Sequence, residues 1–294
     1  MMQFKHYITL LMVFTVCAKN WFEEKRIYNL NASDPIDVLI ACHEKDQDVL
    51  QLCIQSAKKH VQNVRRIIVA SDRRLSDDAE WYDESLLSFS KKSISDEFSS
   101  LDPSFKTSPE KQARVGWYFK QILNFYAPFE IPNISSNVLI LDADTVLLRT
   151  VTFVDEEGNM LHAPGAEYHI PYFEHMQKFL PGLKRVFHKL SGISHHMLFQ
   201  RAVLEDLFNL IESRHNCKFW QAYCRCVDIK DIALAGAADY EIYFNFVLQR
   251  SNQIKIRPLK WTNINQLSFI TPCQEARYHF VSCHHWTRKD LEKK

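Results

Sequence analysis

Glycine is scarce in this chain, with 6 among 294 residues. Neither G-x-G-x-x-G nor G-x-x-x-x-G-K-[ST] occurs, and these are the patterns in which backbone N–H groups cradle phosphates. An excess of one charge is also lacking, because the formal net charge is +1. A nearly neutral chain gives no electrostatic reason to expect a nucleic acid as partner. If the protein binds a phosphate-bearing ligand, we expect a metal ion to hold it.

Cysteine is too sparse to build a disulfide-dependent fold, since eight residues are scattered along the chain. Three of them, Cys217, Cys224 and Cys226, cluster near His215, but the paired C-x-x-C knuckles of common zinc sites are missing. If Cys17 is removed with a signal peptide, the number left is odd. The cluster is open to three interpretations: a zinc site, a disulfide in an exported chain, or free thiols in a chain that is not exported.

The apolar run near the N-terminus, Tyr7–Ala18, is shorter than the roughly 20 residues that span a membrane. It fits the apolar part of a signal peptide, and the pair Val16-x-Ala18 suits cleavage. We expect residues 1–18 to be a signal peptide and 19–34 a linker, in a chain that is exported or delivered to a secretory lumen. An uncleaved signal anchor, which would bring the protein to a membrane, and a buried first helix are the alternatives.

The most informative stretch is an apolar run at 137–141 that stops at Asp142 and Asp144. A short apolar run with β-branched residues is typical of a strand buried on both faces. Residues two apart on an extended chain point the same way, so both carboxylates can reach one cation. Burying a carboxylate is costly unless it is paired or bound to a cation, and Mg²⁺ prefers oxygen ligands. The pattern predicts a divalent-metal site that holds a diphosphate, with two solvated strand-end acids as the alternative.

The first third of the chain has a pattern typical of a β-α-β unit with parallel strands. We expect strands at 37–42 and 65–71, and apolar residues recur at helical spacing over 49–57 between them. His43 and Asp72 directly follow these strands. Loops after parallel strands often contact a ligand, so both residues are candidates for binding one. A cap or a solvated loop position is the alternative for each.

Residues 75–109 are rich in serine and aspartate without a sustained period, which predicts a loop or lid with a short helix or two. The next stretch, 110–123, has the apolar pattern of a largely buried helix. We expect Pro128 to end this helix. Arg114 and Lys120 indicate that one side of the helix meets something polar, either a phosphate or the acids of ordinary salt bridges.

The second half of the chain contains further polar features. Gly192 stands between small polar residues and suits a tight turn or a close approach to a ligand. His195 and His196 are adjacent, so they should diverge, and one of them is a candidate for contacting substrate. Asp239 and Glu241 open a helix, where capping explains the first acid better than the second. An acid among aromatic residues can also have its pKa raised and act as a general base.

A second histidine pair, His284 and His285, lies beside Trp286 near the end of the chain. One of these imidazoles would complete a ligand set of two oxygens and one nitrogen with the carboxylates that follow the 137–141 strand. Such a set suits Mn²⁺ or Mg²⁺.

In their order these motifs resemble the metal-dependent glycosyltransferases of the GT-A fold. That family has a β-α-β nucleotide-binding half, a strand ending in D-x-D, a glycine turn, an acid-bearing helix start and a late histidine. Within the fold, the chain looks most like a group of predicted glycosyltransferases. The matching segments are Arg114 to Gln121, Leu141 to Asp144, Ser191 to Met197, Tyr240 to Tyr243 and His284 to Trp286. More distantly the chain is similar to glycogenin-like retaining enzymes, whose late histidine binds Mn²⁺.

The resemblance implies an α/β, GT-A-like Rossmann-type single domain over 35–288, with a mostly parallel central sheet, followed by a charged tail at 289–294. It implies transfer of a sugar from a nucleotide-sugar donor to a glycan, protein or lipid acceptor, with Mn²⁺ or Mg²⁺ as cofactor. Whether the reaction inverts or retains the anomeric configuration stays open. A metal-dependent phosphohydrolase or nucleotidyltransferase, and a non-catalytic nucleotide-sugar-binding protein, are the alternatives.

The motifs and the resemblance together assign a role to each candidate residue. The metal would be held by Asp142, Asp144 and His284, with His285 as the alternative to the last. The catalytic acids would be Glu241 and Asp239. The donor would be bound by His43, Asp72, Arg114, Trp117, Gln121, Asp142, Gly192 and His196.

Overall fold

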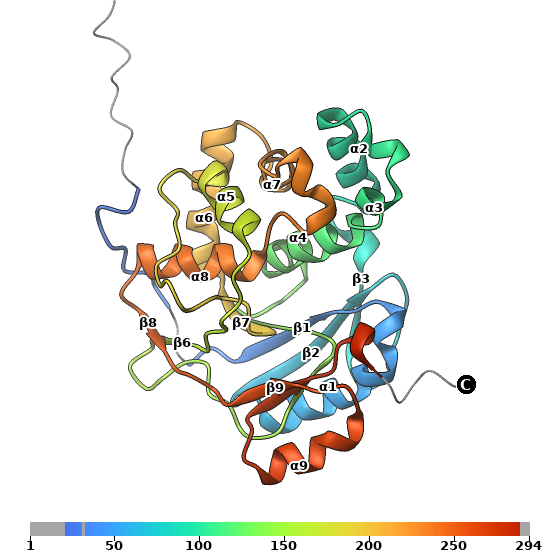
Figure 1. The fold of residues 1–294 in the computed structure, drawn as a ribbon. Coiled ribbons are helices and arrows are strands. Elements are labelled where there is room, and N and C mark those ends of the chain that lie inside the picture. The colour runs from blue at the N-terminus through green and yellow to red at the C-terminus, as the bar shows by residue number, and fades with distance from the viewer. Residues whose placement is uncertain (1–20, 31–32, 289–294) are drawn as a thin grey trace, which may run out of the picture.

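The computed structural model describes residues 21–30 and 33–288. Its central sheet is formed by β1 (Ile36–Ala41), β2 (Val64–Ser71), β3 (Glu80–Asp83), β4 (Asn137–Leu141) and β7 (His196–Gln200). Their order is β3-β2-β1-β4-β7 (Figure 1). The first four strands are parallel and β7 is antiparallel to β4. The α/β class with a mostly parallel sheet is therefore confirmed, whereas the predicted signal peptide and charged tail lie outside the described residues.

The β-α-β unit predicted at the start of the chain is present as β1, α1 (Gln47–His60) and β2. Side chains of the sheet alternate between two apolar cores. Leu39 faces the core that contains the buried residues of α4 (Val115–Glu130) and α8 (Asp239–Arg250), whereas Val38 faces the core that contains those of α1. Helices thus cover both faces of the sheet (Figure 1), which explains why its strands are continuous apolar runs.

The segment before β4 differs from the predictions at two points. Residues 75–109, predicted to be a loop or lid with a short helix or two, contain the helix α2 (Lys91–Leu101) but also the edge strand β3, which was not predicted. Pro128 does not end its helix, because α4 continues to Glu130. The proline lies in the last turn and is itself buried, so packing of the helix offsets the one backbone hydrogen bond that the ring removes.

The second half of the chain adds a helical layer and two small sheets. β5 pairs antiparallel with β10, which pairs in parallel with β9, and β6 pairs in parallel with β8. The remaining elements are α3 (Pro109–Gln112), β5 (Thr145–Leu147), β6 (Met160–His162), α5 (Ile170–Phe179), α6 (Arg201–His215), α7 (Phe219–Arg225), β8 (Ile254–Ile256), β9 (Trp261–Asn263), α9 (Ile270–Glu275) and β10 (Phe280–Ser282).

The cysteine cluster is neither a zinc site nor a disulfide in the described part of the chain. Cys217, Cys224 and Cys226 are free thiols, and the last two are buried. Burial raises the pKa of Cys226 to about 12, so it stays protonated at neutral pH. Within the same residues, the helices are all too short or too polar to cross a membrane.

Candidate active site

The polar residues that follow β4 lie at the carboxyl edge of the sheet, where its order reverses. β2 lies on one side of β1 and β4 on the other, so the ends of β1 and β4 border the crevice in which open α/β sheets bind their ligands. Asp142 directly follows β4 there. β7 ends the sheet beside it, because His196 pairs with Leu141.

Asp142 is surrounded by hydrogen-bond donors. The Nζ of Lys120 in α4 lies 2.7 Å from its Oδ1, and the Tyr240 hydroxyl in α8 donates to the same oxygen at 3.3 Å. The Nδ1 of His195 lies 3.3 Å from Oδ2. Burial would raise the pKa of Asp142, but the ammonium of Lys120 and the ring of His195 hold it well below its ordinary range. Asp142 is therefore an ionised carboxylate with a cation beside it.

Asp144 is held by residues from the end of the chain. The antiparallel pairing of β5 with β10 brings Ser282 opposite Thr145. Ser282 Oγ donates to Asp144 Oδ1 at 3.0 Å, and Nδ1 of His284 lies 2.8 Å from Oδ2. Burial would raise the pKa of Asp144, but the hydrogen bond from His284 lowers it overall. His284 therefore contacts Asp144, and the prediction that it binds a metal together with both acids stays a prediction.

The two halves of the site meet through aromatic rings. The ring centroids of His195 and His284 are 5.0 Å apart, and those of His195 and Trp261 are 4.9 Å apart. Trp286 stacks on His284 with centroids 4.6 Å apart and ring planes inclined by 7°. Its side chain is 72% exposed, so this tryptophan offers an open aromatic face beside the acids.

Asp142, Asp144 and His284 match in kind the oxygen and nitrogen donors that Mn²⁺ and Mg²⁺ accept. Each of the four carboxylate oxygens nevertheless accepts a hydrogen bond already. In the described residues, the group of three possible ligands within 4.8 Å of one another is a different one: Glu174, Asp228 and Asp231. A cation at the D-x-D would therefore exchange existing hydrogen bonds and would not enter a preformed cage.

Asp239 begins α8 and is fixed by α4. Asn124 donates to Oδ2 of Asp239 at 2.7 Å. The backbone N–H of Asp239 donates to Oε1 of Gln121 at 2.7 Å. Its side chain is buried, and burial raises the pKa of this carboxyl to about 7 despite the bond from Asn124. The positive charge of Lys120 lowers the pKa of Asp239, and the negative charge of Asp142 raises it. A carboxyl with this pKa can accept or release a proton near neutral pH.

Glu241, the second acid of α8, is engaged with the loop that precedes β7. Its Oε2 accepts from Ser191 Oγ at 3.0 Å and from the N–H of Gly192 at 2.5 Å. Its Oε1 has no hydrogen-bond partner among the described residues, and burial raises its pKa. A Cβ on Gly192 would lie 2.5 Å from the Tyr240 carbonyl oxygen. Close approach to α8 explains this glycine, and Glu241 is the residue that ties the loop to the helix.

The other predicted donor-binding residues are scattered. His43 is exposed and accepts from its neighbour Lys45 N–H, while Asp72 is exposed after β2. Arg114 and Trp117 donate to the carbonyl oxygens of residues 233 and 237. With Gln121 they hold the segment that leads into α8. Their contacts are structural, and their predicted contact with a donor stays a prediction.

The histidine pair diverges as predicted, but His195 and not His196 reaches Asp142. His196 is buried, neither of its ring nitrogens has a partner among the described residues, and burial lowers its pKa to about 3. The φ of His195 is 63°, a left-handed conformation that non-glycine residues seldom adopt outside constrained sites. The adjacency of the histidines predicted the divergence, but this backbone conformation left no signal in the sequence.

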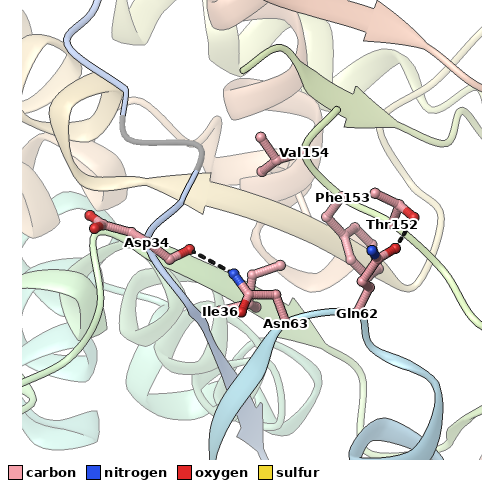
Figure 2. Close-up of a pocket in the computed structure, with 7 residues that line it drawn as sticks. All are labelled: Asp34, Ile36, Gln62, Asn63, Thr152, Phe153 and Val154. Carbon is pink, nitrogen blue, oxygen red and sulfur yellow. Dashed lines mark hydrogen bonds between the residues drawn. The ribbon is translucent and has the colours of Figure 1, made fainter. Parts of the chain in front are cut away.

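One cavity in the described part of the chain lies away from these residues. It measures about 450 Å³ and is lined by Ile36, Asn63, Thr152 and neighbouring residues (Figure 2). Ile36 begins β1 and Asn63 precedes β2, so the cavity is at the amino edge of the parallel strands. The acids and histidines described above lie at the carboxyl edge. We therefore base the candidate active site on the chemistry and not on cavity size.

Comparisons with known proteins add little to this geometry. The sequence matches no family model and no curated protein. Among solved structures, the apo form of mouse xyloside xylosyltransferase 1 matches 87% of this chain and 99% of its own, with 10% sequence identity and a TM-score of 0.40. So distant a likeness carries no argument, and the α/β assignment rests on the sheet order.

Proposed function

We propose that the protein is a glycosyltransferase that moves a sugar from a nucleotide-sugar donor to a hydroxyl of an acceptor. The observation that supports this most is the meeting of Asp142, Lys120, Asp144 and His284 at the carboxyl edge of the sheet. Carboxylates placed among cationic donors suit a diphosphate and its counter-ion. The order of sequence motifs, which resembles that of GT-A enzymes, points to the same reaction.

The transfer breaks the bond between the sugar anomeric carbon and the diphosphate and forms a bond from that carbon to the acceptor oxygen. The leaving nucleoside diphosphate gains negative charge, which the ammonium of Lys120 and the imidazoles of His195 and His284 can stabilise. The acceptor hydroxyl loses its proton. Asp239 is suited to take it, since its pKa is about 7; in a retaining enzyme the same acid would orient the sugar.

A divalent cation, Mn²⁺ or Mg²⁺, would be held by Asp142, Asp144 and His284 and would supply Lewis-acid neutralisation of the diphosphate. Lys120 already supplies a positive charge at Asp142. Before the donor binds, Lys120 would keep that carboxylate ionised and oriented.

Donor hydrolysis tests the proposal without knowledge of the acceptor. Residues 19–294 would be incubated with a panel of nucleotide-sugars and Mn²⁺, with and without EDTA, beside Asp144→Asn and the surface control Asp96→Asn. We expect metal-dependent release of a nucleoside diphosphate that Asp144→Asn abolishes and Asp96→Asn leaves unchanged. No release and no metal-dependent nucleotide binding with any donor would refute the assignment.

The product distinguishes this reaction from its rivals. A metal-dependent phosphohydrolase cleaves a P–O bond within the diphosphate and so releases a nucleoside monophosphate. A nucleotidyltransferase would transfer that monophosphate group. A non-catalytic sugar-binding protein would bind the donor, with or without metal, and release nothing.

A further inference from the structure

Exposed apolar side chains are concentrated on one part of the molecule. In the described residues twelve large apolar side chains are exposed by more than a third, and six of them come from three short segments at 166–170, 184–189 and 229–234. Exposed apolar patches of this kind mark interaction sites. We call the six the apolar rim: Tyr168, Ile170, Val186, Phe187, Ile229 and Leu234.

The three segments are joined by contacts into one surface. The guanidinium of Arg185 lies 4.7 Å from the ring centroid of Tyr168, and Gly165 forms a backbone bridge with Ser191. The Nε2 of His169 is 3.0 Å from the carbonyl oxygen of Leu234. These segments run beside α5 and α8 (Figure 1).

The apolar rim borders the candidate active site. The segment that carries Val186 and Phe187 leads directly to Ser191 and Gly192, which bind Glu241 of α8. Tyr240, the residue before Glu241, donates to Asp142, so a surface that the rim contacts would lie on the α8 side of the candidate active site.

The rim is flanked by positive charge. Lys184, His188 and Lys189 are exposed in the same segment as Val186 and Phe187. Over the residues that the structure describes, neither of these lysines has a salt-bridge partner within 4.0 Å. Lys230 lies 3.7 Å from Glu174, and Glu167 is the exposed acid beside Tyr168. The three segments hold Lys184, Arg185, Lys189 and Lys230 against Glu167 and Asp231, so their excess of positive charge lies in 184–189.

We propose that the apolar rim docks on an anionic lipid bilayer and places the active site at the membrane surface. Exposed apolar side chains next to lysines fit the interfacial region of such a bilayer. The apolar side chains enter the boundary between headgroups and acyl chains, and the lysine ammonium groups contact the lipid phosphates. A protein partner fits less well, because lysine is depleted in protein interfaces. A carbohydrate partner also fits less well, because the side chains of valine, isoleucine and leucine offer no hydrogen-bond partner for sugar hydroxyls. If the proposed function also holds, the acceptor is carried in or on that membrane.

Vesicle co-sedimentation tests the docking without any donor, so its outcome is independent of the proposed glycosyl transfer. Residues 19–294, which include every residue that the structure describes, would be mixed with vesicles of phosphatidylcholine alone or with phosphatidylserine. We expect binding to the mixed vesicles that weakens with salt. The double variants Val186→Ser/Phe187→Ser and Lys184→Glu/Lys189→Glu should each lower the partition coefficient by about tenfold or more.

Matched controls separate the rim from general surface effects. Leu86→Ser removes an apolar side chain that is 69% exposed elsewhere, and Lys58→Glu/Lys59→Glu reverses two exposed charges on α1. Both should bind vesicles as the parent chain does. Failure of the parent chain to bind mixed vesicles, or equal losses in rim and control variants, would overturn the proposal.

Discussion

The ammonium of Lys120 lies 2.7 Å from Oδ1 of Asp142, so the first acid of the D-x-D pair is neutralised by a side chain of the protein itself. Lys120 comes from α4 and Asp142 from the end of β4. The pair therefore links the helical layer to the carboxyl edge of the sheet. It also explains how a carboxylate that is only 18% exposed remains ionised before any ligand binds.

Replacing Lys120 by methionine should impair both folding and activity. The change leaves Asp142 buried without its cation, which we expect to lower the free energy of unfolding by about 1–3 kcal/mol, because Lys120 is itself one-third exposed. Donor hydrolysis should fall at least about a hundredfold if the ammonium also stabilises the leaving diphosphate. Urea denaturation and the hydrolysis assay measure the two effects.

Two further variants show whether such losses come from the missing charge at Asp142. Lys120→Arg keeps the charge and should retain most of the stability, whereas Lys91→Met removes a surface lysine paired with Glu84 and should leave hydrolysis unchanged. If Lys120→Met hydrolyses donor as fast as the parent chain, Lys120 has no part in the reaction.

Asp239 should make stability and activity depend on pH. Its pKa is about 7 in the folded protein against an ordinary value of 3.8, so between these values the folded chain binds more protons than the unfolded chain. The free energy of unfolding therefore falls as pH rises from about 4 to 7, by about 4 kcal/mol in total from Asp239. Asp239→Asn should lack this fall, which denaturation of both proteins at pH 5 and pH 8 would reveal.

The same acid should set the rate profile if it takes the acceptor proton. Transfer would then rise with pH around 7, and Asp239→Asn would abolish the rise. Asp231→Asn, at a buried aspartate on the preceding segment, is the matched control and should leave both profiles unchanged. A parent protein whose stability is flat over this pH range would contradict the assigned pKa.

Two glycines should respond in opposite ways to the same substitution. Alanine at Gly192 would place its Cβ 2.5 Å from the Tyr240 carbonyl oxygen and 2.7 Å from Cβ of Phe244. We expect a loss of about 2–3 kcal/mol. Gly116 is in α4, and a Cβ added to it would have no heavy atom within 4 Å apart from its chain neighbours and the backbone of its own helix, so alanine there should stabilise by about 0.5–1 kcal/mol. Thermal unfolding of both variants checks the pair, and a tolerated Gly192→Ala would show that α8 can move away from the loop.

The parts of the fold that could be predicted from the sequence are those with an unambiguous local pattern. β1, β4 and the second half of β2 are buried on both faces and therefore form largely apolar runs bounded by polar residues. The two acids after β4 could be recognised because they directly follow an unbroken apolar run. β3 was missed because it is an edge strand of four residues in which Tyr82 alone is buried, so it has no continuous apolar pattern.

The long-range roles of single residues could not be predicted. Arg114, Trp117 and Gln121 bind backbone groups before and at the start of α8, contacts that the sequence did not indicate, and their assignment to the donor stays a prediction. Local periodicity reports which face of a helix is polar and not which distant segment that face meets. His195 was left out in favour of His196, because the choice depends on a left-handed backbone conformation.

Trp286 should contribute to ligand affinity without contributing to the fold. Its ring is 72% exposed and stacks on His284. A large exposed aromatic surface beside the groups proposed to bind the diphosphate suits stacking with a flat ligand such as a nucleotide base. Base stacking is worth about 1–3 kcal/mol by alanine substitution, so Trp286→Ala should raise the Kd of the preferred nucleoside diphosphate by about tenfold or more. Trp286→Tyr keeps an aromatic face and should retain most of the affinity. Calorimetric titration measures both, and melting temperatures should stay close to that of the parent chain. An unchanged Kd in Trp286→Ala would show that the ligand does not reach this ring, whereas a large drop in melting temperature would show that the stack on His284 holds the end of the chain in place.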